Sequence, residues 1–110
     1  MNKTKCAKCR GDEVRVIVIE PNGVPETRIV KRNLETFQGI VGGYIEMMTV
    51  VNNGIAMYIN EEGRMNGMPL NTVASAIAHR LVFGPVVIFR SARGENEDSL
   101  TEDDIRAITE

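Results

Sequence analysis

The sequence predicts a single α+β domain in the order ββαββαβα, with a mostly antiparallel sheet of about five strands and helices on one face. Three observations lead to this prediction. Two pairs of strand-like runs are each joined by Asn-Gly turn chemistry, at Pro21–Gly23 and at Asn52–Gly54. The all-apolar run Val86–Phe89 is typical of an interior strand. Segments that follow Asn33 and Asn71 carry apolar residues at helical spacing.

The first half of the domain begins with a predicted hairpin. Val14–Ile19 is almost entirely β-branched, so we expect a strand that is covered on both faces, and Thr27–Val30 returns as a shorter edge strand. Asn33 can cap a helix, and Gly42 and Gly43 can end it with a left-handed residue. The predicted apolar face of this helix consists of Leu34, Phe37 and Val41.

The second half predicts another hairpin, from Tyr44–Val51 and Ile55–Ile59, and a helix from about Thr72 to Arg80. Asn71 is placed to cap this helix. Its apolar stripe is expected to consist of Val73, Ile77 and Leu81 with Ala74 and Ala78.

A last helix of about two turns is predicted near the C-terminus. Thr101 and Asp104 resemble a capping box, in which each side chain accepts a hydrogen bond from the backbone N–H of the other residue. Leu100 and Ile105 occupy the positions of a hydrophobic staple.

Composition limits the class of protein. The chain has 110 residues, of which 43% are hydrophobic and 25% charged, as in a globular domain. Residues 1–12 predict a flexible basic arm, so the domain is expected at 13–110. A net charge of −2 argues against a general nucleic-acid coat, and no apolar run reaches the ~18 residues that span a membrane. We therefore expect a cytoplasmic protein.

The segment Asn60–Asn71 holds the densest group of hydrogen-bonding side chains in the chain. Asparagine and arginine offer donors and acceptors that suit a nucleobase or a phosphate. Strand ends, turns and the helix cap offer most of these residues a structural role as well. We hypothesise a ligand site formed by Asn60, Glu62, Arg64, Asn66 and Asn71, with Arg28 or Arg80 meeting a phosphate.

Cys6 and Cys9 have the spacing of half a zinc site or of a thiol–disulfide pair. Zinc needs four ligands, and a second cysteine pair is absent, so two chains would have to share the metal. Incidental cysteines, zinc and thiol redox chemistry all stay open. We predict no cofactor, with zinc shared between chains at these two residues as the alternative.

No catalytic signature can be named. His79 is the single histidine, and it has no serine, cysteine or carboxylate partner at a recognisable spacing. Neither a Walker loop nor a dinucleotide fingerprint is present. The sequence therefore predicts a protein that is not an enzyme.

Several segments, taken in order, resemble a family of small domains of unknown function seen in bacteria, bacteriophages and conjugative elements. The resemblance covers about residues 14–108 and is carried by Val16–Pro21, Leu34–Glu46, Asn60–Asn71, Gly84–Phe89 and Leu100–Ile105. It implies a bacterial intracellular setting and an accessory protein of a mobile element, but no activity and no catalytic residues. The cysteine arm departs from the family pattern.

The predicted function is a non-enzymatic accessory binding protein of a phage or mobile element. It would counter host defence by binding a host protein or by sequestering a nucleotide signal. The alternative is a zinc-assisted dimer that binds nucleic acid or protein through the Cys6 and Cys9 arm. For the first interpretation nucleic acid is disfavoured as a partner, because the cations of the first hairpin lack interleaved aromatic residues. Homo-oligomerisation remains open.

Overall fold

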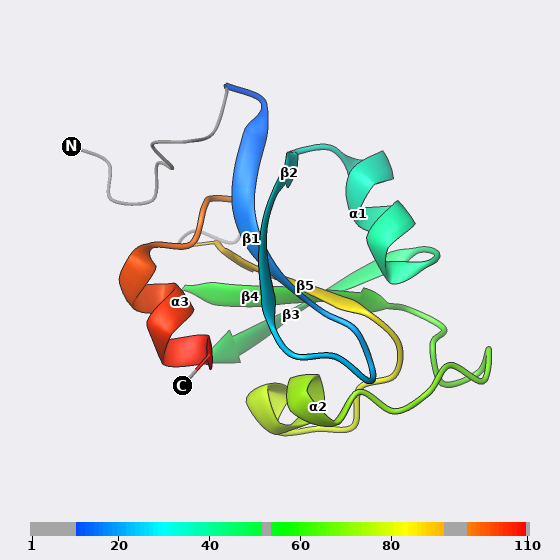
Figure 1. The fold of residues 1–110 in the computed structure, drawn as a ribbon. Helices are drawn as coiled ribbons and strands as arrows, with labels where there is room; N and C mark the ends of the chain where they lie inside the picture. The colour runs from blue at the N-terminus through cyan, green and yellow to red at the C-terminus, as the bar shows by residue number, and fades with distance from the viewer. Residues whose placement is uncertain (1–10, 52–53, 92–96, 110) are drawn as a thin grey trace.

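Five strands form one antiparallel sheet in the spatial order β2-β1-β5-β4-β3 (Figure 1). This computed structural model describes residues 11–51, 54–91 and 97–109. The elements follow the predicted order ββαββαβα. They are β1 (Glu13–Ile19), β2 (Glu26–Lys31), α1 (Leu34–Val41), β3 (Ile45–Val51), β4 (Ile55–Asn60), α2 (Thr72–Ala78), β5 (Val86–Arg90) and α3 (Glu102–Thr109).

The strand β5 joins the two hairpins, since it lies between β1 and β4 and pairs with both. Ile88 is opposite Ile17 on one side and opposite Met57 on the other. Both neighbours are strands, and both faces are covered, so an all-apolar sequence is stable here. The prediction of an interior strand is confirmed, and β2 is an edge strand as expected.

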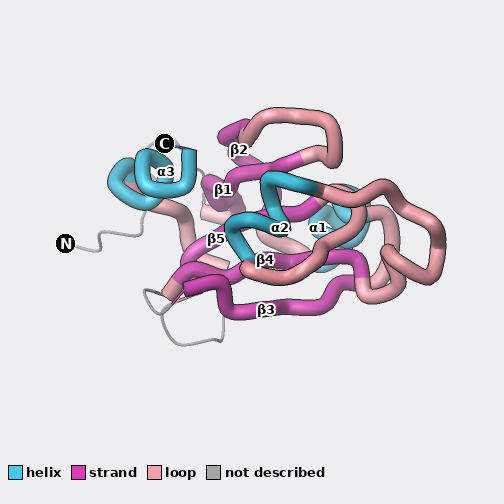
Figure 2. The backbone as a smooth tube through the Cα atoms, turned by 90° about the horizontal axis from the view of Figure 1, so that it is seen from below, coloured by secondary structure: helices cyan, strands magenta, loops and turns pink. Residues whose placement is uncertain are grey.

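Helices cover both faces of the sheet, so the prediction that they lie on one face is wrong. Figure 2, seen from below, shows α2 in front of the sheet and α1 behind it. Phe37 of α1 packs with Val14 and Val16, whereas Ala74 of α2 packs with Ile17 on the opposite face. Successive side chains of a strand point to opposite faces, so β1, which is apolar at both sets of positions, needs cover on both.

The helix α2 ends earlier than predicted. His79, not a glycine, takes the left-handed conformation at the C-cap with φ 58°, and the helix stops at Ala78. Ser75 then holds the returning chain, because its Oγ accepts from the Val82 N–H at 2.8 Å and donates to the Val82 carbonyl at 3.3 Å. Val82 is buried, and Leu81, expected in the apolar stripe, is 59% exposed.

Local capping predictions are confirmed at both ends of α1 and at the start of α3. Asn33 Oδ1 accepts from the Thr36 N–H at 2.8 Å, and Gly42 takes the left-handed C-cap with φ 84°. In the capping box, the Thr101 N–H donates to Asp104 at 2.9 Å and the Asp104 N–H donates to Thr101 at 3.1 Å. Gly54 of the second predicted turn has a positive φ, whereas Asn52 and Asn53 lie outside the described residues.

An ion pair fastens α3 to the central strand. Arg90 of β5 donates to both carboxylate oxygens of Asp104, at 2.8 and 2.5 Å, and both side chains are largely buried. Burial opposes ionisation of Asp104, but hydrogen bonds from Arg90 and Thr101 outweigh it. The pKa of the Asp104 carboxyl therefore lies below its ordinary value.

We predict that Asp104→Asn lowers the free energy of unfolding by about 1–3 kcal/mol at neutral pH. A carboxyl with a lowered folded-state pKa stabilises the fold above its unfolded pKa of about 4, and this contribution is lost as the pH falls through the folded value. The gap between wild type and variant in urea unfolding should therefore shrink below about pH 3.

The matched control is Asp103→Asn, because Asp103 is 91% exposed and meets Arg106 only at 3.6 Å. This change should have little effect at either pH. An Asp104→Asn gap that persisted undiminished in acid would show that ionisation is not the source of the stability.

Candidate functional site

The segment Asn60–Asn71 connects β4 to α2, and its backbone is held by many hydrogen bonds. Within the segment, the Asn66 N–H donates to the Glu62 carbonyl at 2.8 Å and the Met68 N–H to the Gly63 carbonyl at 2.9 Å. Two further bonds tie it to the chain before β5, from Asn71 N–H to Val82 and from Gly84 N–H to Pro69. The segment is therefore a shaped part of the scaffold.

The side chain of Met68 packs against three glycines from distant parts of the sequence. A Cβ on Gly84 would lie 2.6 Å from the Met68 sulfur, and one on Gly42 would lie 3.2 Å from its terminal methyl carbon. A Cβ on Gly63 would touch the same sulfur at 3.5 Å. Only small residues leave room for this flexible thioether, which fixes the segment against the end of α1 and the start of β5.

Asn60 is a mainly structural member of the predicted site. Its amide nitrogen donates to the Val41 carbonyl at 3.1 Å, and its Oδ1 accepts from the Glu62 N–H at 2.8 Å. The residue is buried. It therefore joins the C-terminal end of α1 to the first turn of the segment, and only its edge contributes to the surface.

Asn71 is fully buried, and hydrogen bonds occupy its whole amide. Oδ1 accepts from the Ala74 N–H at 3.0 Å, which confirms the predicted cap of α2. Nδ2 donates to the carbonyl of Ile19 at 2.9 Å and to that of Gly84 at 3.0 Å. A ligand at the surface does not reach this side chain, so we remove Asn71 from the candidate site.

The exposed side chains Glu62 and Asn66 border a hollow of about 280 Å³. The structure adds two residues that the sequence analysis missed, Gln38 from α1 and Tyr44, which is 67% exposed. Among the described residues, the side chains of these four form no hydrogen bond or ion pair with one another or with the rest. Tyr44 reaches the site because its carbonyl accepts from the Glu61 N–H at 2.9 Å.

Arg64 and Arg80 come together at a neighbouring hollow of about 140 Å³, which also includes Glu46 and Glu61. The Arg64 guanidinium lies 5.8 Å from the centre of the Phe83 ring, within cation–π range. Asn60 borders both hollows.

Arg28, the other predicted phosphate contact, lies apart from this site. It belongs to the edge strand β2, pairs with Glu26 and lines a different groove. We therefore remove Arg28 from the candidate site.

Among the described residues, three titratable groups have clearly shifted pKa values, and none of them lines these hollows. Burial, and then the hydrogen bond and negative charge of Glu97, raises the pKa of Tyr58 well above its ordinary value. The pair of Arg90 and Asp104 shifts both pKa values away from neutrality. All three changes favour a fixed protonation state and a structural role.

Cys6 and Cys9 lie outside the described residues, so zinc at this arm stays a prediction. In the part of the chain that the structure describes, no cluster of three metal-ligating side chains is found. In the same part, no helix has the length and apolar character needed to cross a membrane.

Comparisons with known proteins bear on family and fold. A family model described as "Domain of unknown function (DUF3846)" matches residues 14–110, in agreement with the predicted resemblance. The chain is also similar to the structure titled "Crystal structure of small RNA methyltransferase HEN1", with a TM-score of 0.60 and 16% identity. The similarity covers 92% of this chain but only 16% of that one, so it shows a shared fold alone. No curated protein matches the sequence.

We predict that the three asparagines Asn71, Asn33 and Asn66 differ sharply in their effect on stability when each is replaced by alanine. Asn71→Ala removes three hydrogen bonds to buried backbone groups and should cost about 2–4 kcal/mol. Asn33→Ala removes an exposed cap and should cost about 1 kcal/mol. Asn66→Ala should change the free energy of unfolding by less than about 0.5 kcal/mol.

Urea denaturation of the three variants measures these differences. Similar losses for Asn71 and Asn66 would contradict the division of the segment into buried anchors and free surface residues.

Proposed function

We propose that this chain, which belongs to the family described as Domain of unknown function (DUF3846), is a non-enzymatic binding protein for a nucleotide-type ligand. The ligand would occupy the hollows beside the Asn60–Asn71 segment. In a phage or mobile element, such a protein would act as an accessory factor that sequesters a nucleotide signal of host defence.

The observation that carries the proposal is the group of unbonded polar side chains around the 280 Å³ hollow. Gln38 and Asn66 each offer an amide donor and acceptor, and Glu62 offers two acceptor oxygens. These are the groups that pair with the edge of a nucleobase, and the exposed ring of Tyr44 offers a face on which a base can stack.

Rigidity supports the same proposal. The segment is held by backbone bonds, by Asn60 and by the packed side chain of Met68. A site that is ordered before binding loses less conformational entropy when the ligand arrives. Ligand pockets typically measure about 300–1,000 Å³, so the larger hollow suits a single nucleoside better than a dinucleotide.

The charges around the smaller hollow limit the number of phosphate charges that we expect on the ligand. Arg64 and Arg80 are the available phosphate contacts, but Glu46 and Glu61 border the same hollow. Two guanidiniums beside two carboxylates sum to zero net charge, so a phosphate is held here only by direct contact with the guanidiniums. We therefore expect a ligand with one or two phosphate charges, such as a linear or cyclic nucleoside monophosphate, and not a triphosphate.

The lining supports binding without turnover. The titratable side chains that line the larger hollow are those of Glu62 and Tyr44, and no nucleophile is paired with a base there. General acid–base chemistry requires such a partner within hydrogen-bond reach.

We predict that a thermal-shift screen of linear and cyclic mononucleotides identifies a ligand that raises the melting temperature of the full chain. By isothermal titration calorimetry, Arg64→Ala and Asn66→Ala should each weaken its binding by roughly tenfold, through loss of a direct hydrogen bond. The melting temperature of the free protein should stay nearly unchanged, because both side chains are exposed.

Matched controls are Arg32→Ala and Asn22→Ala, which remove the same side chains from exposed positions elsewhere. They should bind like the wild type. A screen without any shift, or equal weakening by the control variants, would overturn the proposal.

A further inference from the structure

The outer edge of β2 carries backbone groups that no other strand of the described chain pairs with. The Arg32 N–H donates to the Asp12 carbonyl at 2.7 Å, which fixes the alternation of the β1–β2 ladder. By that alternation Thr27, Ile29 and Lys31 turn their N–H and carbonyl groups away from β1. The Lys31 carbonyl accepts a hydrogen bond from the Asn33 N–H. Five outward groups of β2 are then left for a partner strand: the three N–H groups and the carbonyls of Thr27 and Ile29.

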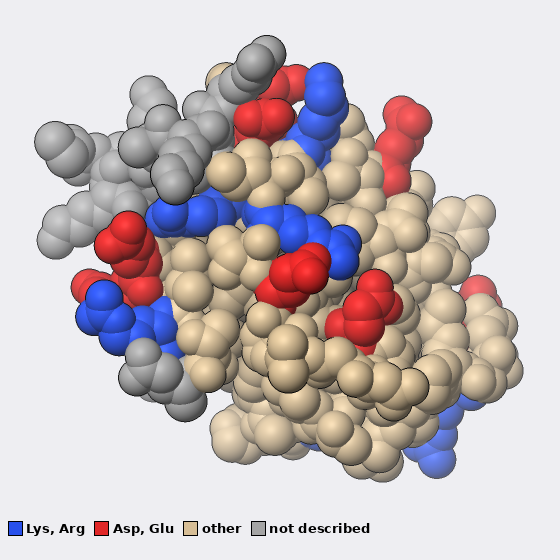
Figure 3. All heavy atoms as spheres, viewed as in Figure 1, with Lys and Arg blue, Asp and Glu red and all other residues tan. Residues whose placement is uncertain are grey.

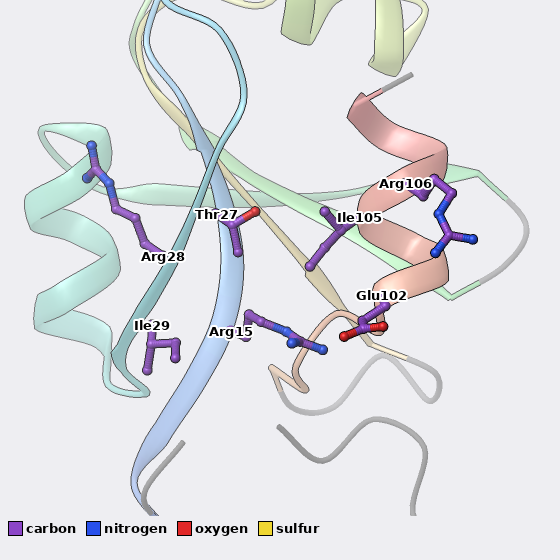
Figure 4. Close-up of a pocket in the computed structure, with 7 residues that line it drawn as sticks. All are labelled: Arg15, Thr27, Arg28, Ile29, Glu102, Ile105 and Arg106. Carbon is purple, nitrogen blue, oxygen red and sulfur yellow. The ribbon is translucent and has the colours of Figure 1, made fainter. Parts of the chain in front are cut away.

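Two of the same residues, Thr27 and Ile29, line a groove of about 610 Å³ between the first hairpin and α3 (Figure 4). Arg15 of β1 and Ile105 of α3 complete its floor and wall. Figure 4 shows Arg15 extending toward Glu102 and Ile105 extending toward Thr27. Ile29 is 39% exposed, so the groove offers apolar surface beside the open strand edge.

Cations outnumber anions in this groove. Arg15 and Arg106 lie near the one carboxylate of its lining, Glu102. Arg28 also lines the groove, but it pairs with Glu26 and in Figure 4 its side chain extends over α1. Arg15 is held in place by two hydrogen bonds, from Nε at 3.0 Å and Nη2 at 2.7 Å, to the Leu100 carbonyl. On the face seen in Figure 3, Lys and Arg side chains lie over β1 and β2 with Asp and Glu side chains beside them.

The two edges of the sheet differ in regularity. The β1–β2 register runs without interruption from Glu13↔Lys31 to Val18↔Glu26. The register of the opposite edge strand, β3, shifts between Thr49 and Val51. A bulge of this kind hinders addition of another strand, whereas a straight edge permits it.

We propose that β2 binds an extended acidic segment of a partner protein as an additional strand. Residues opposite Thr27 and Ile29 would then project their side chains to the face of the groove, where a carboxylate meets Arg15 or Arg106. A peptide backbone supplies both donors and acceptors for the outward groups of β2. A nucleic-acid backbone offers phosphate acceptors and lacks donors for the carbonyls of Thr27 and Ile29. This surface is separate from the nucleotide site and does not depend on it.

The test uses the full chain and a fluorescein-labelled peptide of sequence Thr-Glu-Val-Glu-Val-Glu-Thr, followed by fluorescence anisotropy. We expect Ile29→Pro to weaken binding by at least about tenfold, since it removes an outward N–H that β1 does not use. The matched control is Met47→Pro on β3. The Glu61 N–H donates to the Tyr44 carbonyl, which fixes the alternation of the β3–β4 ladder. By that alternation the Met47 N–H lies on the outer edge of β3, so this variant should bind like the wild type.

The role of the positive charge in the groove is tested by replacing one of its arginines with glutamate. Arg106 is 63% exposed at its side chain, so Arg106→Glu should fold normally. It should weaken binding of the acidic peptide several-fold and strengthen binding of the same peptide with lysine in place of glutamate.

Amide chemical shifts of the wild type keep the test decisive if Ile29→Pro does not fold. Addition of the acidic peptide should shift the Thr27, Ile29 and Lys31 amides. Equal binding of the acidic and lysine peptides, shifts confined to β3, or no binding at all would overturn the proposal.

Discussion

The buried amide of Asn71 is the interaction on which the assembly of this fold depends. Its three hydrogen bonds reach the end of β1, the start of α2 and the chain just before β5. In the described sheet β5 lies between the two hairpins and pairs with both, so the placement of that strand decides whether they form one sheet. One side chain thus fixes β1, α2 and the chain before β5 relative to one another. Its polar amide is stable in the core because it is hydrogen-bonded there.

The same principle explains the polar composition of the Asn60–Asn71 segment. Asn60, Met68 and Asn71 point inward, where two amides and a thioether hold the backbone. Glu62 and Asn66 remain at the surface between these anchors. Much of the chemistry concentrated in this segment is therefore structural, and the rigid frame gives the remaining exposed side chains a fixed geometry.

Features encoded within a few residues could be predicted from the sequence, and features set by distant contacts could not. The caps at Asn33 and Asn71 and the Thr101–Asp104 box depend on neighbours three residues away, and all three are present. The apolar run of β1 indicated cover on both faces, but which helix lies on which face depends on how β5 joins the hairpins, and no local pattern records that. Gln38 and Tyr44 were missed for the same reason, because the turn from α1 to β3 brings them beside the segment.

The two proposed surfaces share no side chain, and β1 is one of the strands that lie between them. Asn71 bonds the carbonyl of its last residue, Ile19, while β2 pairs along its other side. From Val16 to Ile19 the strand is fully buried and packed on both faces. Close-packed cores have few alternative arrangements, and coupling between sites requires an element with two of them. A ligand at the segment and a peptide at β2 would accordingly bind without influencing each other, so the domain would join two partners as a rigid adaptor and not as a switch.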